Sequence, residues 1–123
     1  MGYLLVTLGG GIGAVTRYML STMIHSVWGL GFPWGTLSVN VLGSFIIGLV
    51  MALSLDRNMV SPEVRVLLTT GFCGGLTTFS TFSYETLALL RAEQWVFAGA
   101  NVLANVVVCL LVTALGMAAA HWV

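Results

Sequence analysis

Charged residues are scarce in this chain of 123 residues, and lysine is absent altogether. Only 7% of the residues carry a charge, whereas 59% are hydrophobic, and the four arginines balance four acids. A soluble domain of this length needs a polar surface that so few charged residues do not supply. The chain also lacks a cluster of basic residues that would neutralise phosphate, so we expect no nucleic-acid partner.

Cysteine is rare as well, with two residues in the chain. Cys73 and Cys109 fall within apolar segments, where a free cysteine behaves as a small hydrophobic side chain, and two cysteines do not make a disulfide framework. The two histidines, His25 and His121, stand far apart without thiolate or carboxylate neighbours at ligand spacing, so we expect no transition-metal site. No nucleophile–base pair appears, and we expect the chain not to be an enzyme.

Long hydrophobic segments are what the chain has in abundance. Four segments are each long enough to supply the ~20 helical residues that cross a bilayer. They cover about residues 3–24, 34–55, 64–90 and 96–121, with short loops between them. The first segment has no basic region before it and no cleavage site after it, so we expect no removable signal peptide. The sequence therefore predicts an all-α integral membrane protein, with one domain over residues 1–123 and four transmembrane helices.

The four arginines are divided equally between the two ends of the predicted bundle. Arg57 and Arg65 flank the loop after the second segment, whereas Arg17 and Arg91 lie toward the opposite face. An excess of Lys and Arg on cytoplasmic loops sets the orientation of a membrane protein, so an equal division favours neither orientation. We therefore predict dual topology, and with it an antiparallel homodimer whose two-fold axis lies in the membrane plane.

Small residues recur in the first segment. The pattern Gly9-x-Gly11-x-x-Ala14 formally matches a dinucleotide-binding motif, but that motif needs a preceding strand and an acid about twenty residues later. The first acid in the chain is Asp56. The spacing Gly9-x-x-x-Gly13 instead predicts a helix face that a second helix can approach closely.

Glycine and hydroxyl side chains interrupt the third hydrophobic segment, in residues 71–85. Lipid offers the backbone no hydrogen-bonding partner, so non-helical chain at this depth survives only inside protein or beside water. We predict a break at the centre of this helix, at about residues 73–78, where Gly74 and Gly75 permit conformations closed to other residues. Free carbonyls before such a break favour a cation, and free amides after it favour an anion.

The residues after the predicted break suit a small, strongly hydrated anion. Phe79 and Phe82 share one helix face. Hydroxyl donors stand beside them, at Thr77, Thr78, Ser80, Thr81 and Ser83. The positive edge of a phenyl ring approaches an anion without binding it strongly. Conduction requires binding that permits both entry and exit, and these groups meet that requirement. Ordinary core packing is the alternative for the two rings.

Polar side chains also lie within the second and fourth segments, where they are costly unless they find partners. Asn40 stands early in the second segment. In the fourth, polar side chains and one cysteine recur every four residues and so share one helix face. These are Asn101, Asn105, Cys109 and Thr113. The pattern indicates either a polar track along an ion path or hydrogen bonds between helices.

Arg17, late in the first segment, is the most costly side chain at this depth. One interpretation is that it extends to the interface or pairs with a carboxylate such as Glu85. The other is that it raises the positive potential at the entrance of an anion path. Both remain open at the level of the sequence.

Three motifs of the chain resemble those of the Fluc (CrcB) fluoride channels of bacteria. In chain order they are GGIGAVTRY at residues 10–18, GTLSVNVLG at 35–43 and GFCGGLTTFSTFSYE at 71–85. The resemblance extends over essentially the whole chain, and the third motif is highly specific. It implies a passive, fluoride-selective channel in the bacterial inner membrane that exports fluoride and so lowers its toxicity. It also implies an antiparallel, dual-topology homodimer with two separate pores, surrounded by lipid.

The resemblance also implies roles for individual residues. It places Asn40, Phe79 and Phe82 in the pore, with the hydroxyl groups of Ser80, Thr81 and Ser83 nearby, and Arg17 in the vestibule. It places a structural, non-transported Na⁺ at the dimer centre, bound by the backbone carbonyls of Gly74 and Thr77 from both chains. In the family the fourth segment often carries hydroxyl side chains, whereas this chain has Asn101, Asn105, Cys109 and Thr113, which leaves the path of the ion there open.

A proton-coupled multidrug exporter is the alternative function, because such exporters are also built from four short helices with dual topology. An exporter of this kind needs a carboxylate within the membrane that exchanges protons. Glu85 is the only acidic candidate, and it lies toward one end of the third segment.

Overall fold

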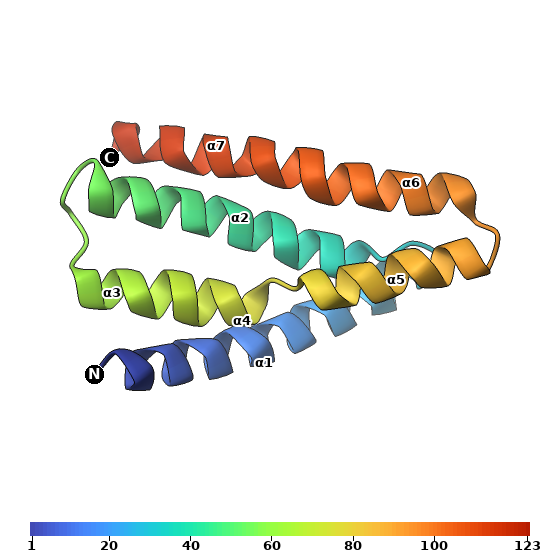
Figure 1. The fold of residues 1–123 in the computed structure, drawn as a ribbon, viewed down its shortest axis with the longest axis horizontal. Helices are drawn as coiled ribbons and strands as arrows, with labels where there is room; N and C mark the ends of the chain where they lie inside the picture. The colour runs from blue at the N-terminus through green and yellow to red at the C-terminus, as the bar shows by residue number, and fades with distance from the viewer.

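The computed structural model describes residues 1–123 and consists of helices joined by short loops. Four rods lie side by side along the long axis of the molecule (Figure 1). The first two rods are the unbroken helices α1 (Gly2–Trp28) and α2 (Trp34–Leu55). Both, together with the fourth rod, are long and apolar enough to cross a membrane. The prediction of an all-α fold is confirmed, and three of the four rods predicted to be transmembrane are long and apolar enough to be so.

The third and fourth rods are composite. The third contains α3 (Pro62–Val66), the π-helical segment η1 (Leu67–Cys73), α4 (Gly74–Leu76) and α5 (Phe79–Arg91). The fourth contains α6 (Trp95–Leu103), the π-helical segment η2 (Ala104–Val108), α7 (Cys109–Ala119) and a final turn, η3 (Ala120–Trp122). Short π-helical segments inside α-helices often accompany functional sites.

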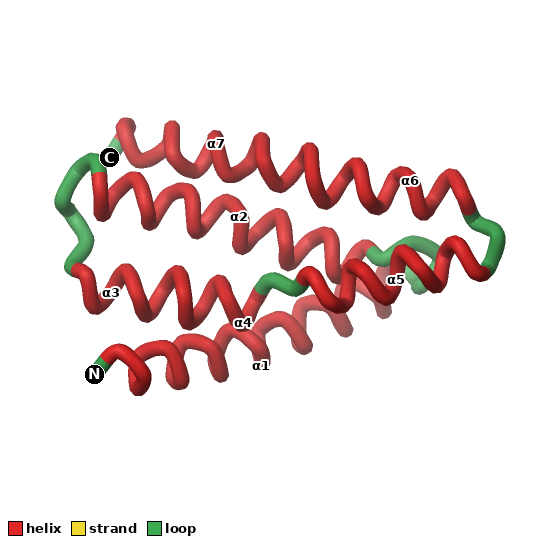
Figure 2. The backbone as a smooth tube through the Cα atoms, in the orientation of Figure 1, coloured by secondary structure: helices red, strands yellow, loops and turns green.

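The break in the third rod is narrower than the sequence predicts. Residues 73–76 are helical, and only Thr77 and Thr78 leave the helix, with ψ of 158° and 121° (Figure 2). The expectation that Gly74 and Gly75 adopt an unusual backbone conformation is wrong, because both belong to α4 and Gly74 has helical angles of φ −61° and ψ −37°. The half-helix before the break therefore continues to Leu76.

Glycines instead allow the third rod and α1 to pack closely against each other. A Cβ atom on Gly75 would lie 2.9 Å from the backbone nitrogen of Ala14, and one on Gly13 would lie 2.9 Å from that of Leu76. Gly9 is equally close to the backbone of η1, where its Cβ would lie 2.9 Å from the nitrogen of Phe72. Backbones approach this closely only where side chains are absent. The prediction of a close helix contact at Gly9 and Gly13 is confirmed.

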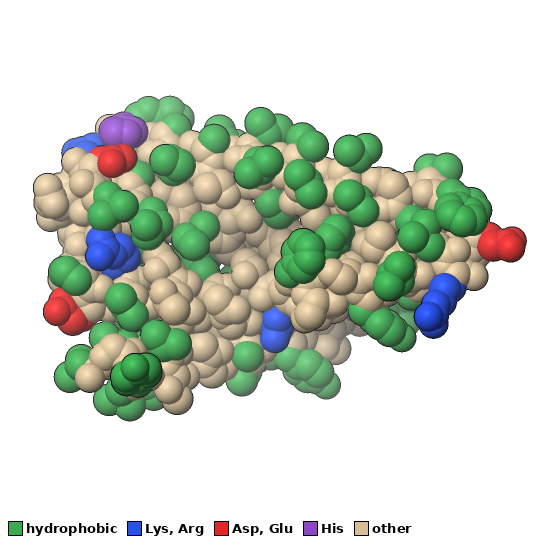
Figure 3. All heavy atoms as spheres, in the orientation of Figure 1, with side chains coloured by type: hydrophobic (Ala, Val, Ile, Leu, Met, Phe, Trp, Pro, Cys, Tyr) green, Lys and Arg blue, Asp and Glu red, His purple; other side chains and the backbone are tan.

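The two ends of the bundle differ from its sides. Both chain termini and the α2–α3 loop lie at one end (Figure 1), and charged side chains gather mainly at the ends, whereas apolar side chains are spread over the sides (Figure 3). Near the termini, Arg57 donates hydrogen bonds to the carbonyls of Ala120 and Val123 at 3.0 and 3.1 Å. These bonds satisfy carbonyls that the end of a helix leaves without partners.

Few large apolar side chains are buried within the single chain. Leu76 and Val39 are fully buried, whereas many others are exposed on the outside of the rods, among them Leu110 and Leu111. A surface of this kind needs lipid or another protein chain around it. The exposed apolar helices fit a multi-pass membrane protein.

Candidate functional site

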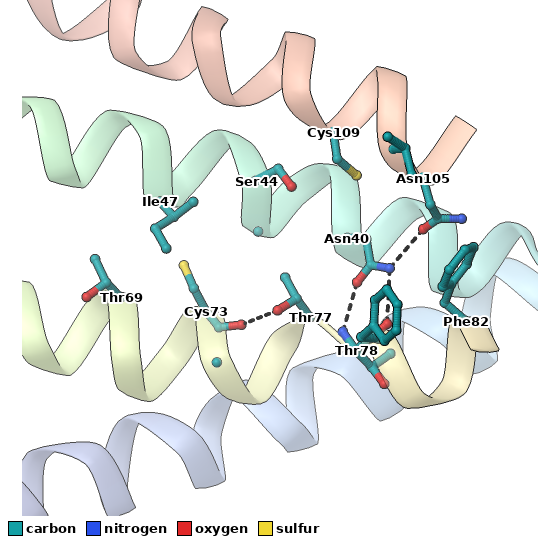
Figure 4. A pocket seen from close by; sticks show the side chains of 14 residues that line it. Asn40, Ser44, Ile47, Thr69, Cys73, Thr77, Thr78, Phe82, Asn105 and Cys109 are labelled. Carbon is teal, nitrogen blue, oxygen red and sulfur yellow. Dashed lines mark hydrogen bonds between the residues drawn. The ribbon is translucent and has the colours of Figure 1, made fainter. Parts of the chain in front are cut away.

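A cavity of about 360 Å³ opens beside the break in the third rod. It lies between α2, the two halves of the third rod and the middle of the fourth rod (Figure 4). Fourteen residues line it, and none of them is charged. Of the site residues that the sequence predicts, the cavity brings together Asn40, Gly74, Thr77, Phe79, Phe82 and Asn105.

Asn40 binds the break directly. Its Oδ1 accepts a hydrogen bond from the backbone N–H of Thr78 at 2.8 Å, and its Nδ2 donates to the carbonyl of Thr78 at 3.2 Å. The carboxamide thus pairs with both main-chain groups of one residue, as a neighbouring strand does in an antiparallel sheet. Backbone groups that leave the helix at membrane depth need such partners. Asn40 supplies them.

Thr78 also caps the second half of the third rod. Its Oγ1 accepts from the backbone N–H of Thr81 at 3.1 Å and donates to Thr81 Oγ1 at 3.0 Å. A threonine in this position satisfies one of the amides that the start of a helix leaves free. Ser80 Oγ lies 3.3 Å from Thr78 Oγ1, and Ser83 donates to the carbonyl of Phe79 at 2.9 Å. Ser80, Thr81 and Ser83 do not line the cavity.

The two phenylalanines of α5 form a contacting pair with different surroundings. Their ring centroids lie 5.4 Å apart, with 55° between the planes. Phe82 is 8% exposed, whereas Phe79 is 78% exposed, although both line the cavity. Core packing within the single chain accounts for Phe82 but not for Phe79.

Hydrogen bonds hold the polar stripe of the fourth rod, by which we mean Asn101, Asn105, Cys109 and Thr113. Asn105 Oδ1 accepts from Asn40 Nδ2 at 2.9 Å, as the close-up shows (Figure 4). Asn105 Nδ2 donates to the carbonyl of Asn101 at 2.9 Å and to its Oδ1 at 3.0 Å. Asn101 is fully buried, and its Nδ2 donates to Thr86 Oγ1 on α5 at 3.0 Å. Hydrogen bonding between helices, one of the two predicted alternatives, is thus present.

The other two residues of the stripe, Cys109 and Thr113, make no hydrogen bond to another helix through their side chains. Cys109 lines the cavity, whereas Thr113 does not. Thr113 Oγ1 donates to the carbonyl of Cys109 at 2.8 Å, within its own helix. The main chain of Thr113 packs against α2, where a Cβ atom on Gly48 would lie 3.2 Å from its Cα.

Arg17 reaches the break rather than the carboxylate of Glu85. Its Nη1 donates to the carbonyl of Thr77 at 3.1 Å. Glu85 instead accepts a hydrogen bond from Thr36 Oγ1. Arg17, Thr36 and Glu85 line a second cavity of about 430 Å³, together with His25 and five other residues. Thr78 also lines the first cavity.

The two residues expected to hold Na⁺ lie on the last turn before the break. Gly74 is exposed, and Thr77 is half-buried. In a continuing helix the Thr78 amide would donate to the Gly74 carbonyl. Here it donates to Asn40 instead. The Thr77 carbonyl accepts from Arg17 and keeps a second lone pair. Carbonyl oxygens at a broken helix are suitable ligands for such a cation, although the guanidinium beside Thr77 opposes it by charge.

The family follows from comparison with known proteins. The family model described as "CrcB-like protein, Camphor Resistance (CrcB)" matches residues 4–117. The chain belongs to this family. A relative from Geotalea daltonii, named "Fluoride-specific ion channel FluC", is 52% identical over 114 residues, which cover 93% of this chain and 92% of the relative. A relative of the same name from Geobacter metallireducens is 50% identical over 116 residues, which cover 94% of each chain.

Membership of the CrcB family confirms the resemblance that the three motifs predict. It also confirms that the chain is not an enzyme, since the relatives are named as ion channels. The expected roles of individual residues stay predictions. The structure gives the hydrogen-bond partners of these residues and the distances between them.

Two residues of the site were not among the predicted ones. Thr36 binds Glu85, and Thr86 accepts from Asn101. The sequence carries a signal for both of them. Thr36 stands four residues before Asn40, and Thr86 four residues after Phe82, so each shares a helix face with a predicted site residue.

Proposed function

We propose that the chain is a fluoride-selective ion channel and that the cavity at the break belongs to its permeation path. The names of the relatives supply the ion. One observation supports a role for particular residues: Asn40, Phe79 and Phe82 line the same cavity beside the break. These are the residues to which the family resemblance assigns the pore.

The chemistry of this cavity favours a passive channel over a proton-coupled exporter. Its lining is neutral and combines amide groups, hydroxyl groups and two phenyl rings. Hydroxyl donors and ring edges hold an anion weakly enough for release, as conduction requires. A proton-coupled exporter needs a carboxylate at its binding site, and Glu85 lines other cavities. Fluoride would then leave the cytoplasm down its gradient, which lowers fluoride toxicity.

An antiparallel, dual-topology homodimer in the bacterial inner membrane, with two pores, is part of the proposal. The ends of the bundle differ by one arginine, with Arg57 and Arg65 at one end and Arg91 at the other, because Arg17 binds at the break, and so small a difference supports dual topology. Phe79 supports it too, because this ring is 78% exposed on the single chain while it lines the cavity. A second chain packed against this side would cover the ring and close the cavity.

A structural Na⁺ between the two chains is the remaining part of the proposal. The carbonyls of Gly74 and Thr77 from each chain would hold it, with the second lone pair of Thr77 free for the cation. A bound cation between two half-helices would offset the partial negative charge of their carbonyl ends. Arg17 shares the Thr77 oxygen, and its place beside the break also suits a vestibule residue that attracts anions.

Ion efflux from liposomes that contain the purified protein tests the function. We expect rapid release of fluoride, followed with a fluoride electrode, and no comparable release of chloride. Phe79→Ile and Asn40→Asp should abolish the release. Phe97→Ile makes the same aromatic substitution on α6, away from the break, and should leave the release unchanged. Equal release of the two anions by the unaltered protein would refute the selectivity.

A further inference from the structure

A continuous series of hydrogen bonds runs from the break through the fourth rod and back to α5. We call it the amide relay. In order, the donors and acceptors are Thr78 N–H to Asn40 Oδ1 (2.8 Å), Asn40 Nδ2 to Asn105 Oδ1 (2.9 Å), Asn105 Nδ2 to Asn101 Oδ1 (3.0 Å), Asn101 Nδ2 to Thr86 Oγ1 (3.0 Å) and Thr86 Oγ1 to the Phe82 carbonyl (2.8 Å). Every bond in the series donates in the same direction.

Both ends of the amide relay are anchored to the main chain of one helical turn. Thr78 is the N-cap of α5, and the Phe82 carbonyl belongs to the first turn of the same helix. The turn between these anchors carries Phe79 and Phe82. Asn40 of α2 thus holds α5 at its N-cap, Thr78, and Asn101 of the fourth rod holds it at Thr86, whose hydroxyl bonds back to the first turn.

The first donor of the amide relay determines the orientation of every amide after it. A backbone N–H only donates, so Asn40 has to present Oδ1 to Thr78, which turns its Nδ2 toward Asn105. Asn105 and then Asn101 likewise present Oδ1 to the preceding donor and Nδ2 to the next acceptor. Reversing any one amide would bring two donors or two acceptors together in a buried site, which is unfavourable.

The amide relay leaves the cavity amides without hydrogens to offer an ion. An asparagine has two amide hydrogens. Those of Asn40 go to the Thr78 carbonyl and to Asn105 Oδ1, and those of Asn105 go to the carbonyl and Oδ1 of Asn101. Asn101 is fully buried and does not line the cavity. The amide hydrogens of Asn40 and Asn105 are thus fully used in hydrogen bonds within the protein.

We propose that Asn101, Asn105 and Thr86 are positioning residues for conduction rather than ligands of the ion. They hold the Asn40 carboxamide in place against the Thr78 peptide, and so support the turn that carries the two rings. This inference rests on the proposed channel function, and it assigns to Thr86 a role although Thr86 lies outside the cavity.

Thr86→Val is the decisive variant, because it keeps the shape of the side chain and removes the acceptor at the far end of the amide relay. We expect fluoride efflux to fall roughly tenfold, as for partners in one hydrogen-bond network. Asn101→Leu should cause a similar loss, and the double variant should lose no more than either single variant. Thr86→Ser, which keeps the hydroxyl, should restore the efflux.

Thr16→Val is the matched control. Thr16 Oγ1 donates to the carbonyl four residues earlier, Ile12, at 2.8 Å, as Thr86 does to Phe82, but it has no place in the amide relay. Its efflux should equal that of the unaltered protein. A loss in Asn101→Leu without a loss in Thr86→Val would overturn the proposal, because Asn101 would then act on the ion itself.

A spectroscopic measurement separates the amide relay from the channel function. In the NMR spectrum of the labelled protein in micelles, Thr86→Val should shift the Thr78 amide proton and speed its hydrogen exchange, although three amides lie between the two residues. Thr16→Val should change neither. An unchanged Thr78 signal in Thr86→Val would refute the relay. A shifted signal in a protein that conducts no fluoride would support the relay and refute the proposed function.

Discussion

Among single residues, Asn40 makes the contacts on which the non-helical chain at the break depends. It serves the N–H and the carbonyl of Thr78 and also Asn105 Oδ1. Asn40→Ala would remove the partner of these groups at a depth where lipid offers no replacement. Since each unsatisfied buried group costs about 1–3 kcal/mol, we expect the free energy of unfolding to fall by about 3 kcal/mol. Unfolding by SDS titration in mixed micelles measures this change.

Ser44→Ala is the control for that measurement. Ser44 lies one turn further along α2, and its side chain lines the same cavity (Figure 4). Its removal should lower the free energy of unfolding by less than about 1 kcal/mol. Equal losses in the two variants would contradict the role of Asn40 as the partner of the break.

The sequence predicts which polar residues matter but not which partners they have. Asn40 and the stripe stand out because amide groups are rare in apolar segments. Their partners lie 38 and 65 positions away, and helical spacing relates only positions within one helix. For the same reason the sequence permits a pair between Arg17 and Glu85, whereas the structure gives these side chains to the Thr77 carbonyl and to Thr36.

Among the elements, the third rod shows where reasoning from residue type reaches its limit. Glycine permits many conformations, which predicts a break at Gly74 and Gly75, but the chain there stays helical. The break occurs two residues later, because Thr78 caps α5 with its own hydroxyl and Asn40 satisfies its main chain. The position of the break thus depends on partners from another rod, whereas the existence of a break is visible in the sequence.

Gly75→Ala tests the packing role of the glycines. The added Cβ atom would lie 2.9 Å from the backbone nitrogen of Ala14, so α1 and α4 would have to separate. We expect a loss of about 1–3 kcal/mol in the free energy of unfolding. Gly99→Ala makes the same change on α6, where nothing lies within 4 Å of the added atom. It should be neutral or stabilise by up to about 1 kcal/mol, because alanine favours helix.

The comparison of these two glycines separates backbone freedom from close approach. Both are helical, so an effect of conformation alone would change their stabilities alike. A loss at Gly75 with none at Gly99, again measured by SDS titration, assigns the effect to the contact with α1. Equal stabilisation of both variants would contradict that contact.

At the scale of the whole molecule, composition and segment length predict the four helical rods, three of which are long and apolar enough to cross a membrane. Twenty apolar residues define a span without reference to any partner. The proposed assembly is different, because it depends on a second chain, and the single chain carries only two features that bear on it. These are the exposed Phe79 beside the cavity and the small difference in arginines between the ends, where Arg57 and Arg65 lie at one end and Arg91 at the other.

Added lysines test whether both orientations are needed. Met59→Lys with Val123→Lys places two charges at the end that holds the termini, and Leu30→Lys with Gln94→Lys places two at the other end. All four positions are exposed. Because basic residues stay in the cytoplasm, each pair should hold every copy in one orientation, opposite for the two pairs. A tag at the C-terminus, probed from outside the cells, reports that orientation.

An antiparallel dimer predicts a specific result for fluoride efflux from cells that express these proteins. Either lysine pair alone should lose nearly all efflux, because every copy then lacks a partner of the opposite orientation. Expression of the two pairs together should restore it, since opposite copies are again present. Glutamine at Met59 and Val123 adds no charge and should change nothing. Full efflux from one pair, with its tag on one side only, would show that the pore does not need an antiparallel partner, and Phe79 would then face lipid.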